Sequence, residues 1–312
     1  MSLISIQAPA AVVLVRPHRF HPNPETAADN AFQRVASEAG HDLPPTMAAA
    51  ARDEITMVAA ALQAAGVRVH VFDDHGERET PDSVFPNNWF STHPGGHVAL
   101  YPMYSTNRRR ERRSDVIEML KAEYRVQDII DYSGLEHDGV FLEGTGAMVL
   151  DHIARIAYTA RSRRADPIAL ERFCTHFNFE PVCFDTSDAA GREIYHTNVM
   201  MSVATEFALV GLGLISDTQR RAEVCRRLEE SGRTVIALED RQIHEFAANA
   251  LELSGTHGRV LAISARSVDC LTPQQRATIE RSATILPLHV PTIELAGGSV
   301  RCMLAGIHLA RR

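Results

Sequence analysis

The sequence predicts an α/β fold in which helix and strand patterns alternate along the chain. Units made of a helix pattern and a hairpin-like pair of strand patterns recur about five times, without recognisable sequence repetition. No linker or break in composition divides the 312 residues, so a single domain spanning residues 1–312 is predicted. Hydrophobic residues make up 45% of the chain and charged residues 23%, which is ordinary for a globular protein with an ample core.

The first unit is predicted to begin with a buried strand at 10–15, a continuous apolar run that an Arg-Pro pair ends. The segment at 17–25, rich in Pro, His and Asn, is predicted to form a loop. A helix follows at 46–65, where Ala, Met and Leu dominate and a glycine marks the C-terminal end. Residues 67–72 alternate between apolar and polar side chains and therefore predict a strand.

The next part of the chain contains two predicted hairpins. The polar stretch at 82–91 holds the chain's single tryptophan, and a Pro-Gly-Gly turn after it predicts a hairpin with a strand at 97–101. A helix is predicted at 109–124. The segment 139–150 is predicted as two short strands around a Glu-Gly-Thr-Gly sequence, and a strand at 153–158 completes the second hairpin.

The second half of the chain continues the alternation. An N-cap at Ser216 or Asp217 and a glycine beyond residue 231 define a helix at 217–231. The final segment, 297–308, is predicted to hold Cys302 at the edge of a strand beside a glycine-containing loop. The remaining predicted helices lie at 167–177, 242–250 and 273–282, and the strands at 179–184, 207–214, 234–238, 260–264 and 284–288.

Charge and hydropathy exclude several classes of function. The net charge of −7 does not favour binding to nucleic acid or to an anionic membrane. The longest strongly apolar run, 207–215, is half the ~18 residues that a membrane helix needs. The one basic run, 108–113, is predicted to open a helix and form a solvated face. Five cysteines without short-spaced pairs, and no leader pattern at the N-terminus, predict a reducing, cytoplasmic location.

Cys302 is the first candidate for chemistry. It follows a Gly-Gly-Ser-Val-Arg sequence, and glycines permit close approach between backbone and ligand. Most free cysteines are small buried hydrophobic residues, which is the alternative for Cys302. A cysteine accompanied by a histidine and a carboxylate in motif-like settings, here His196 and Glu143, is however a candidate nucleophile.

Four motifs strengthen that interpretation: DSVFPNNW at 82–89, LEGTG at 142–146, YHTN at 195–198 and GGSVRC at 297–302. With them, the chain resembles the guanidine-modifying enzymes of the pentein superfamily, which include arginine deiminases, dimethylarginine hydrolases, succinylarginine dihydrolases and amidinotransferases. It looks most like the arginine-deiminase-related citrulline-utilisation hydrolases. The resemblance covers residues 12–309. It implies a five-bladed α/β propeller of ββαβ-type repeats with pseudo-fivefold symmetry and a site at the central channel.

The resemblance also implies roles for the candidate residues. Cys302 would be the nucleophile that attacks the central carbon of a guanidino or ureido group, and covalent catalysis divides that barrier into two steps. His196 would protonate the leaving group and then deprotonate the hydrolytic water. Glu143 would accept hydrogen bonds from substrate N–H groups and orient the histidine. No metal, nucleotide or other cofactor is implied.

Two asparagines depart from the arginine deiminase pattern. Asn88 and Asn198 stand near positions where those enzymes carry acids that would face a cation. An unpaired guanidinium is costly to bury, whereas a neutral ureido group is not, and an amide can donate to its carbonyl oxygen. The two amides therefore favour citrulline over arginine, unless they only cap turns.

Further side chains are predicted to bind the substrate. Asp82 matches a substrate-contacting acid of the dimethylarginine hydrolases. Arg164 matches an arginine that clamps the substrate's α-carboxylate, a pairing that guanidinium geometry suits. An arginine of the 108–113 run is a candidate for a second clamp, and the sequence does not say which one.

The sequence thus predicts a cofactor-independent hydrolase whose small-molecule substrate is citrulline, converted to ornithine, carbon dioxide and ammonia. An amidinotransferase and an arginine or dimethylarginine hydrolase are the alternatives with related chemistry, and a propeller-shaped binding protein is the alternative from another class. Homo-oligomerisation is left open. A zinc site at Cys174, His176 and Cys183 is disfavoured, because these residues lack a second close-spaced pair.

Overall fold

The computed structural model describes residues 6–33 and 45–312. Within these residues the strands form five three-stranded sheets. In each sheet the central strand pairs antiparallel with one neighbour and parallel with the other. Each sheet is therefore an antiparallel pair plus a third strand that runs parallel to the central one, as in the ββαβ-type repeat that the resemblance implies; in four of the sheets the antiparallel pair is a hairpin.

The strands are short, and three consecutive strands build every sheet except the first, which β15 shares with β1 and β2. Their bounds are β1 Ala11–Pro17, β2 Arg68–Asp74, β3 Phe90–His93, β4 His97–Leu100, β5 Asp128–Asp131, β6 Met148–Asp151, β7 Ile156–Ala160, β8 Glu180–Phe184, β9 Met201–Val203, β10 Phe207–Val210, β11 Thr234–Ala237, β12 Leu251–Gly255, β13 Gly258–Ser264, β14 Thr284–Leu288 and β15 Ala305–Gly306.

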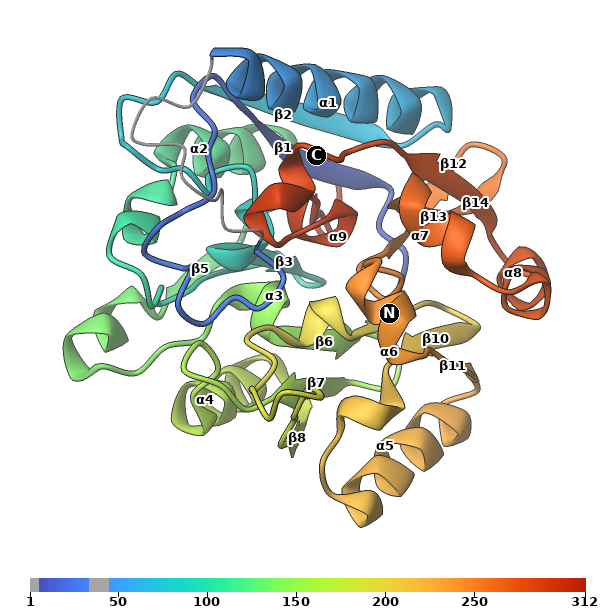
Figure 1. Cartoon of the computed structure of the whole chain (residues 1–312). Helices are drawn as coiled ribbons and strands as arrows, with labels where there is room; N and C mark the ends of the chain where they lie inside the picture. The colour runs from blue at the N-terminus through green and yellow to red at the C-terminus, as the bar shows by residue number, and fades with distance from the viewer. Residues whose placement is uncertain (1–5, 34–44) are drawn as a thin grey trace.

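Helices connect the parallel strands of the sheets, and short helical turns precede several hairpins. The α-helices are α1 Pro45–Ala64, α2 Ser114–Glu123, α3 Gly144–Ala147, α4 Pro167–Phe177, α5 Thr218–Glu230, α6 Asp240–His244, α7 Ala265–Cys270, α8 Pro273–Glu280 and α9 Val300–Met303. The 3₁₀ turns are η1 Pro86–Asn88, η2 Asn107–Glu111, η3 Ser133–Asp138, η4 Thr197–Val199, η5 Leu212–Leu214 and η6 Ile293–Ala296. Figure 1 shows α1, α2, α4, α5 and α8 on the outside of the ring of sheets and α9 near its centre.

The first and last strands close the ring. β15 pairs antiparallel with β1, in a register that joins Val12 to Gly306 and Val13 to Ala305. The backbone N–H of Ile307 continues this contact by donating to the carbonyl of Ala11 at 2.8 Å. Segments from near both ends of the described residues thus contribute to one sheet, while the single domain expected from the sequence stays a prediction.

Two expected elements change because backbone conformation interrupts them. Helix 109–124 divides into η2 and α2, since Arg112 and Arg113 adopt extended conformations between them. The segment 139–150 contains α3 followed by β6, and Gly144 has a left-handed φ of 47° that breaks any strand before it.

Two further expectations are wrong near the C-terminal end. The helix predicted at 242–250 ends at His244, and Phe246 takes a left-handed φ of 60°. Cys302 lies within α9 rather than at a strand edge, and its backbone N–H donates to the carbonyl of Ser299 at 3.0 Å. Three strands were not predicted by the sequence pattern: β5, β9 and β12.

Within the described ranges, no helix has both the length and the apolar character that crossing a membrane requires.

Ile307 tests the closure of the ring. Its side chain is buried in a cluster with Val13, Trp89 and Phe90, which come from the first and second sheets. Ile307→Ala should lower the free energy of unfolding by about 2–5 kcal/mol, because it leaves a cavity in this cluster. Ile153→Ala, at a position that is 46% exposed, is the matched control and should change stability by less than about 0.5 kcal/mol. Equal effects in urea denaturation would contradict the packing of the chain's end against the first sheet.

Candidate active site

Most of the predicted site residues, together with Asn249, come from equivalent places in the five sheets, whereas Asp82 and Arg164 lie in other turns. Each sheet has a turn directly before the strand that opens its hairpin, and each turn carries a polar side chain of the site. These side chains are Asn88 in η1, Glu143 before α3, His196 and Asn198 at η4, Asn249 before β12 and Cys302 in α9. The repeated architecture therefore gathers residues that are far apart in the sequence.

These turns surround a small buried cavity. Its polar walls are Asp82, Asn88, Arg108, Arg164, His196 and Cys302. Its volume is about 10 Å³, close to that of one water molecule. Thr26 and Asn30, from the N-terminal segment, line another wall, so a ligand the size of an amino acid enters only if part of the wall moves.

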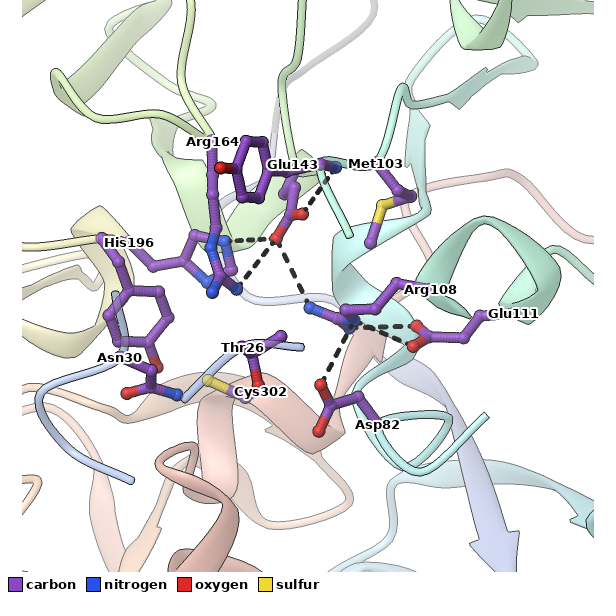
Figure 2. Close-up of polar contacts among 12 residues, drawn as sticks. Thr26, Asn30, Asp82, Met103, Arg108, Glu111, Glu143, Arg164, His196 and Cys302 are labelled. Carbon is purple, nitrogen blue, oxygen red and sulfur yellow. Dashed lines mark hydrogen bonds and ion pairs between the residues drawn. The ribbon is translucent and has the colours of Figure 1, made fainter. Parts of the chain in front are cut away.

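Glu143 lies at the centre of the polar contacts (Figure 2). Its Oε2 contacts His196 Nε2 at 2.8 Å, Arg108 Nη1 at 3.4 Å and Arg164 Nη1 at 3.5 Å. Its Oε1 accepts a hydrogen bond from the backbone N–H of Tyr104 at 3.0 Å. The carboxylate is completely buried, so its charge is balanced by these neighbours rather than by water.

This arrangement changes the pKa of both members of the Glu143–His196 pair. Burial alone would raise the pKa of Glu143, but Arg164, the hydrogen bond to His196 and Arg108 outweigh burial and lower it. Burial lowers the pKa of His196 to about 4, although Glu143 acts in the opposite direction. At neutral pH the pair is therefore a carboxylate beside a neutral imidazole that can accept a proton.

The absence of a side chain at Gly146 lets this pair form. A Cβ atom at Gly146 would lie 2.9 Å from His196 Nδ1 and would also collide with the amide of Asn88. The Gly-Thr-Gly sequence after Glu143 is thus a packing requirement of the site.

Arg108 belongs to the site, although the sequence predicted that its basic run forms a solvated face. The side chain is 2% exposed, and its guanidinium donates to both carboxylate oxygens of Glu111 at 2.8 and 3.0 Å. Its Nε lies 3.7 Å from Asp82 Oδ2. For Arg108, the prediction of a solvated surface is wrong, because buried carboxylates from several elements surround the guanidinium.

Asp82 and Asn88 also contact the guanidinium of Arg108. In the orientation that satisfies its amide, Asn88 Oδ1 accepts from both Nη atoms of Arg108 at 3.0 and 2.9 Å. Asn23 Nδ2 donates to Asp82 Oδ2 at 2.7 Å, while Asp82 Oδ1 is buried with no hydrogen-bond partner among the described residues. Burial raises the pKa of Asp82.

Arg164, expected to clamp a substrate carboxylate, lies in the site but already has a carboxylate partner. Its Nε donates to Asp29 Oδ2 at 3.0 Å, and its Nη2 also pairs with Asp29. The guanidinium is buried, and it stacks near the ring of Tyr195 at 5.0 Å. A substrate carboxylate could use Arg164 only in place of Asp29 or beside it.

The thiol of Cys302 receives two amide N–H groups. Asn198 Nδ2 and Asn249 Nδ2 each donate to its sulfur at 3.3 Å. Asn249 also donates to the carbonyl of Asn198 at 2.9 Å, which fixes the two amides relative to each other. Donors aimed at sulfur stabilise a thiolate more than a thiol. Sequence reasoning missed Asn249, because an asparagine before a short strand is also typical of an ordinary turn.

The other cysteines differ from Cys302 in their surroundings. Burial raises the pKa of Cys174 to about 12 and also raises the pKa of Cys183, Cys225 and Cys270. All five thiols are free. In the parts of the chain that the structure describes, no group of three or more His, Cys, Asp or Glu residues has the geometry of a metal site.

Comparison with protein families identifies the group to which these motifs belong. Residues 16–309 match the family described as N,N dimethylarginine dimethylhydrolase, eukaryotic. The chain belongs to this family. Membership confirms the predicted relation to the guanidine-modifying enzymes and makes the chain one of the C–N hydrolases of arginine-related amino acids. The closer relation to citrulline-utilisation hydrolases stays a prediction.

Solved structures share the fold of this family member at low sequence identity. The N-terminal domain of ArgZ, a cyanobacterial arginine dihydrolase solved as a mutant bound to substrate, is 14% identical with a TM-score of 0.72, and 96% of this chain and 98% of that chain are covered. Unliganded AgrE is 15% identical with a TM-score of 0.73, over 97% of this chain and 40% of that chain. A dimethylarginine dimethylaminohydrolase, solved as an adduct with 4-chloro-2-hydroxymethylpyridine, is 13% identical with a TM-score of 0.62, and the match covers 97% of this chain and 99% of that chain.

These similarities confirm the pentein fold, the five-bladed α/β propeller expected from the sequence. The comparison with curated proteins gave no match.

Glu143→Gln tests the central pair of the site. The substitution removes the charge that raises the pKa of His196 against burial, so that pKa should fall further below about 4. The measurement is an NMR titration of the His196 ring in the native and variant proteins. Glu118→Gln changes an exposed glutamate that pairs with Lys121 and should leave the His196 titration unaltered. An unchanged or higher pKa of His196 in Glu143→Gln would mean that the two side chains do not interact in solution.

Proposed function

We propose that the chain is a cysteine-dependent hydrolase that converts citrulline and water to ornithine, carbon dioxide and ammonia. The observation that carries the proposal is that Cys302 and His196 border the same buried cavity, and that Glu143 contacts His196 from behind at 2.8 Å. A nucleophile, a proton carrier and a group that orients the carrier are the elements that covalent hydrolysis requires.

In the first step, the sulfur of Cys302 forms a bond to the ureido carbon of citrulline. The terminal C–N bond breaks, and the thiol proton, carried by His196, leaves with the nitrogen as ammonia. The amide N–H groups of Asn198 and Asn249 stabilise the negative sulfur before attack and after release. The neutral imidazole can accept the thiol proton; burial makes it a weak base, and the neighbouring Glu143 carboxylate counteracts this by stabilising the imidazolium.

In the second step, water adds to the S-linked carbonyl carbon. His196 takes a proton from this water, the C–S bond breaks, and Cys302 recovers its proton. The released carbamate of ornithine loses carbon dioxide to give ornithine. Glu143 remains a carboxylate throughout and stabilises the imidazolium that forms in each step.

The amides at positions 88 and 198 support a neutral ureido group rather than a guanidinium. The cavity wall carries two guanidinium groups, Arg108 and Arg164, and one carboxylate, Asp82. Both arginines already have carboxylate partners, Glu111 and Asp29 among them, so the arginines alone do not decide between the two substrates. Asn88 and Asn198 add amides where acids would otherwise balance a cationic substrate.

The names of related proteins suggest alternative substrates for the same chemistry. ArgZ is described as an arginine dihydrolase, and one of its variants was solved covalently bonded to a reaction intermediate. The family model is named for dimethylarginine hydrolysis. An arginine or methylarginine hydrolase is therefore the second candidate, and an amidinotransferase differs only in using an amine instead of water to release the intermediate.

Cys302→Ser is the first test of the proposal. Hydroxyl oxygen is a much weaker nucleophile than a thiolate, so the variant should lose nearly all ammonia release from citrulline while its far-UV circular dichroism stays native. Cys225→Ser, on α5 away from the cavity, is the matched control and should keep full activity. If Cys302→Ser retained even a tenth of the native rate, Cys302 would not be the nucleophile.

The two asparagines test substrate choice. Asn88→Asp combined with Asn198→Asp should raise the ratio of kcat/KM for arginine to that for citrulline by about tenfold or more, because carboxylates stabilise a nearby cation. Arg108 contacts position 88 and would neutralise part of the new carboxylate's charge, so the aspartate there should attract a cationic substrate less than an isolated carboxylate would. Asn178→Asp, at an exposed helix end, should leave the ratio unchanged. A native protein that prefers arginine to citrulline would contradict the charge argument.

A further inference from the structure

A second cavity lies on the other side of α9 from Cys302. Cys302 borders the candidate active site, whereas the preceding residue, Arg301, borders a separate cavity of about 40 Å³. Other walls of the second cavity include Gln7, Thr92, His93, His152 and His308. The two cavities share no lining residue, so they are distinct spaces separated by the turns around the ring's centre.

Arg301 gives the second cavity a partly buried positive charge with no carboxylate partner among the described residues. Among residues 6–33 and 45–312, no carboxylate lies within ion-pair distance of its guanidinium. One N–H group, on Nη1, donates to the carbonyl of Leu304 at 2.9 Å. A guanidinium has five N–H donors, and a buried one is stabilised when an anion accepts several of them. Burial lowers the pKa of Arg301 to about 10, and the neighbouring Cys302 sulfur offsets this only in part.

Three histidines extend the set of donors. His152 stacks on His308 with ring centroids 3.9 Å apart, and its centroid is 6.1 Å from that of His93. The Nδ1 atoms of His93 and His152 are buried and have no hydrogen-bond partner among the described residues. Both side chains are more than nine-tenths buried. These two nitrogens are themselves occluded, and His93 Nε2 already contacts Ser91 Oγ at 2.7 Å, so His152 and His308 are the histidines left to meet a solute at the cavity wall.

The lining favours an anion over a metal ion. Histidines commonly bind transition metals, but no metal-site geometry occurs among the described residues, and the Arg301 charge would repel a cation. No Asp or Glu from the described part of the chain lines the cavity. Burial also lowers the pKa of His93, His152 and His308, so their rings are neutral at pH 7 and can each donate one N–H without adding charge.

We propose that this cavity, bounded by Arg301, His93, His152 and His308, binds a small oxyanion. The guanidinium of Arg301 supplies the charge, and the imidazole N–H groups supply directed hydrogen bonds. The volume suits an oxyanion of a few heavy atoms, such as phosphate or a simple carboxylate, rather than an amino acid. The proposal concerns a site distinct from the one where the hydrolysis is proposed, and it does not depend on that reaction.

Binding can be measured on the full-length protein by isothermal titration calorimetry. One arm uses inorganic phosphate and the other sodium formate, both at an ionic strength held constant with sodium chloride. Saturable binding of at least one of these anions is expected. The anion with the lower dissociation constant shows whether a tetrahedral or a planar oxyanion fits the cavity better. The NMR signals of the His152 and His308 rings should shift with the same dissociation constant.

Three variants locate the site. Arg301→Gln should weaken the measured affinity by about tenfold or more, because it removes a charge-assisted donor. Arg164→Gln changes an arginine of the other cavity, and Arg226→Gln changes an exposed arginine on α5; both should keep the native affinity. If Arg301→Gln does not fold, His152→Asn replaces it and should also weaken binding.

Two results would overturn the proposal. One is the absence of saturable binding of either anion to the native protein. The other is binding that Arg164→Gln abolishes and Arg301→Gln preserves, which would assign the anion to the candidate active site instead.

Discussion

The carboxylate of Glu143 is the charge on which the buried site depends. It is the common partner of Arg108, Arg164 and His196, and none of these four side chains is more than 2% exposed. Removing one partner from a buried set of charges typically costs about 3–5 kcal/mol, because the remaining charges are left uncompensated. Glu143 therefore does more than orient a histidine, since it makes burial of two guanidinium groups beside the cavity tolerable.

The same network explains the protonation state of the site. Burial, and to a smaller extent the two nearby arginines, lowers the pKa of His196, and the Glu143 hydrogen bond only partly offsets that tendency. The imidazole consequently begins neutral, next to a carboxylate that can stabilise it once a proton arrives. This combination suits a group that must carry a proton in both directions during two successive steps.

The ring of sheets supplies the rigidity that these contacts require. Each contributing turn is followed at once by a strand whose pairing fixes its position, as β6 does for Glu143 and β9 for Asn198. Side chains held by turns between fixed elements keep their geometry better than those on long loops. Asn249 extends this support by contacting the Cys302 sulfur with its Nδ2 and the Arg301 backbone N–H with its Oδ1, at 3.3 and 3.0 Å. It thereby touches the residues that border the two cavities.

Local signals made part of this fold predictable from the sequence. Helix α4 has the predicted bounds, because Asp166 caps it and a proline occupies its first turn. The hairpin of β3 and β4 follows from its Pro-Gly-Gly turn. The grouping of Cys302, His196 and Glu143 came from motif resemblance, and the structure brings His196 into contact with Glu143 and sets Cys302 beside the same cavity.

What the sequence could not predict depends on contacts distant along the chain. Arg108 lies in a run whose local composition indicates a surface, and its burial depends on Asp82 and Glu143, which are distant in the sequence, as well as on the nearby Glu111. The Asp29 partner of Arg164 lies 135 positions away. Strand β12 was missed because its short, mixed sequence becomes a strand only through pairing with β13.

The central claim is that the sulfur of Cys302 bonds covalently to the substrate, and trapping that bond is the most direct test. Native protein would be mixed with citrulline, quenched in acid during turnover, digested and examined by mass spectrometry. The account predicts an adduct of citrulline less ammonia on the peptide that contains Cys302, appearing before ornithine accumulates. Ornithine formation without any such adduct, or an adduct confined to Cys174, Cys183, Cys225 or Cys270, would contradict it.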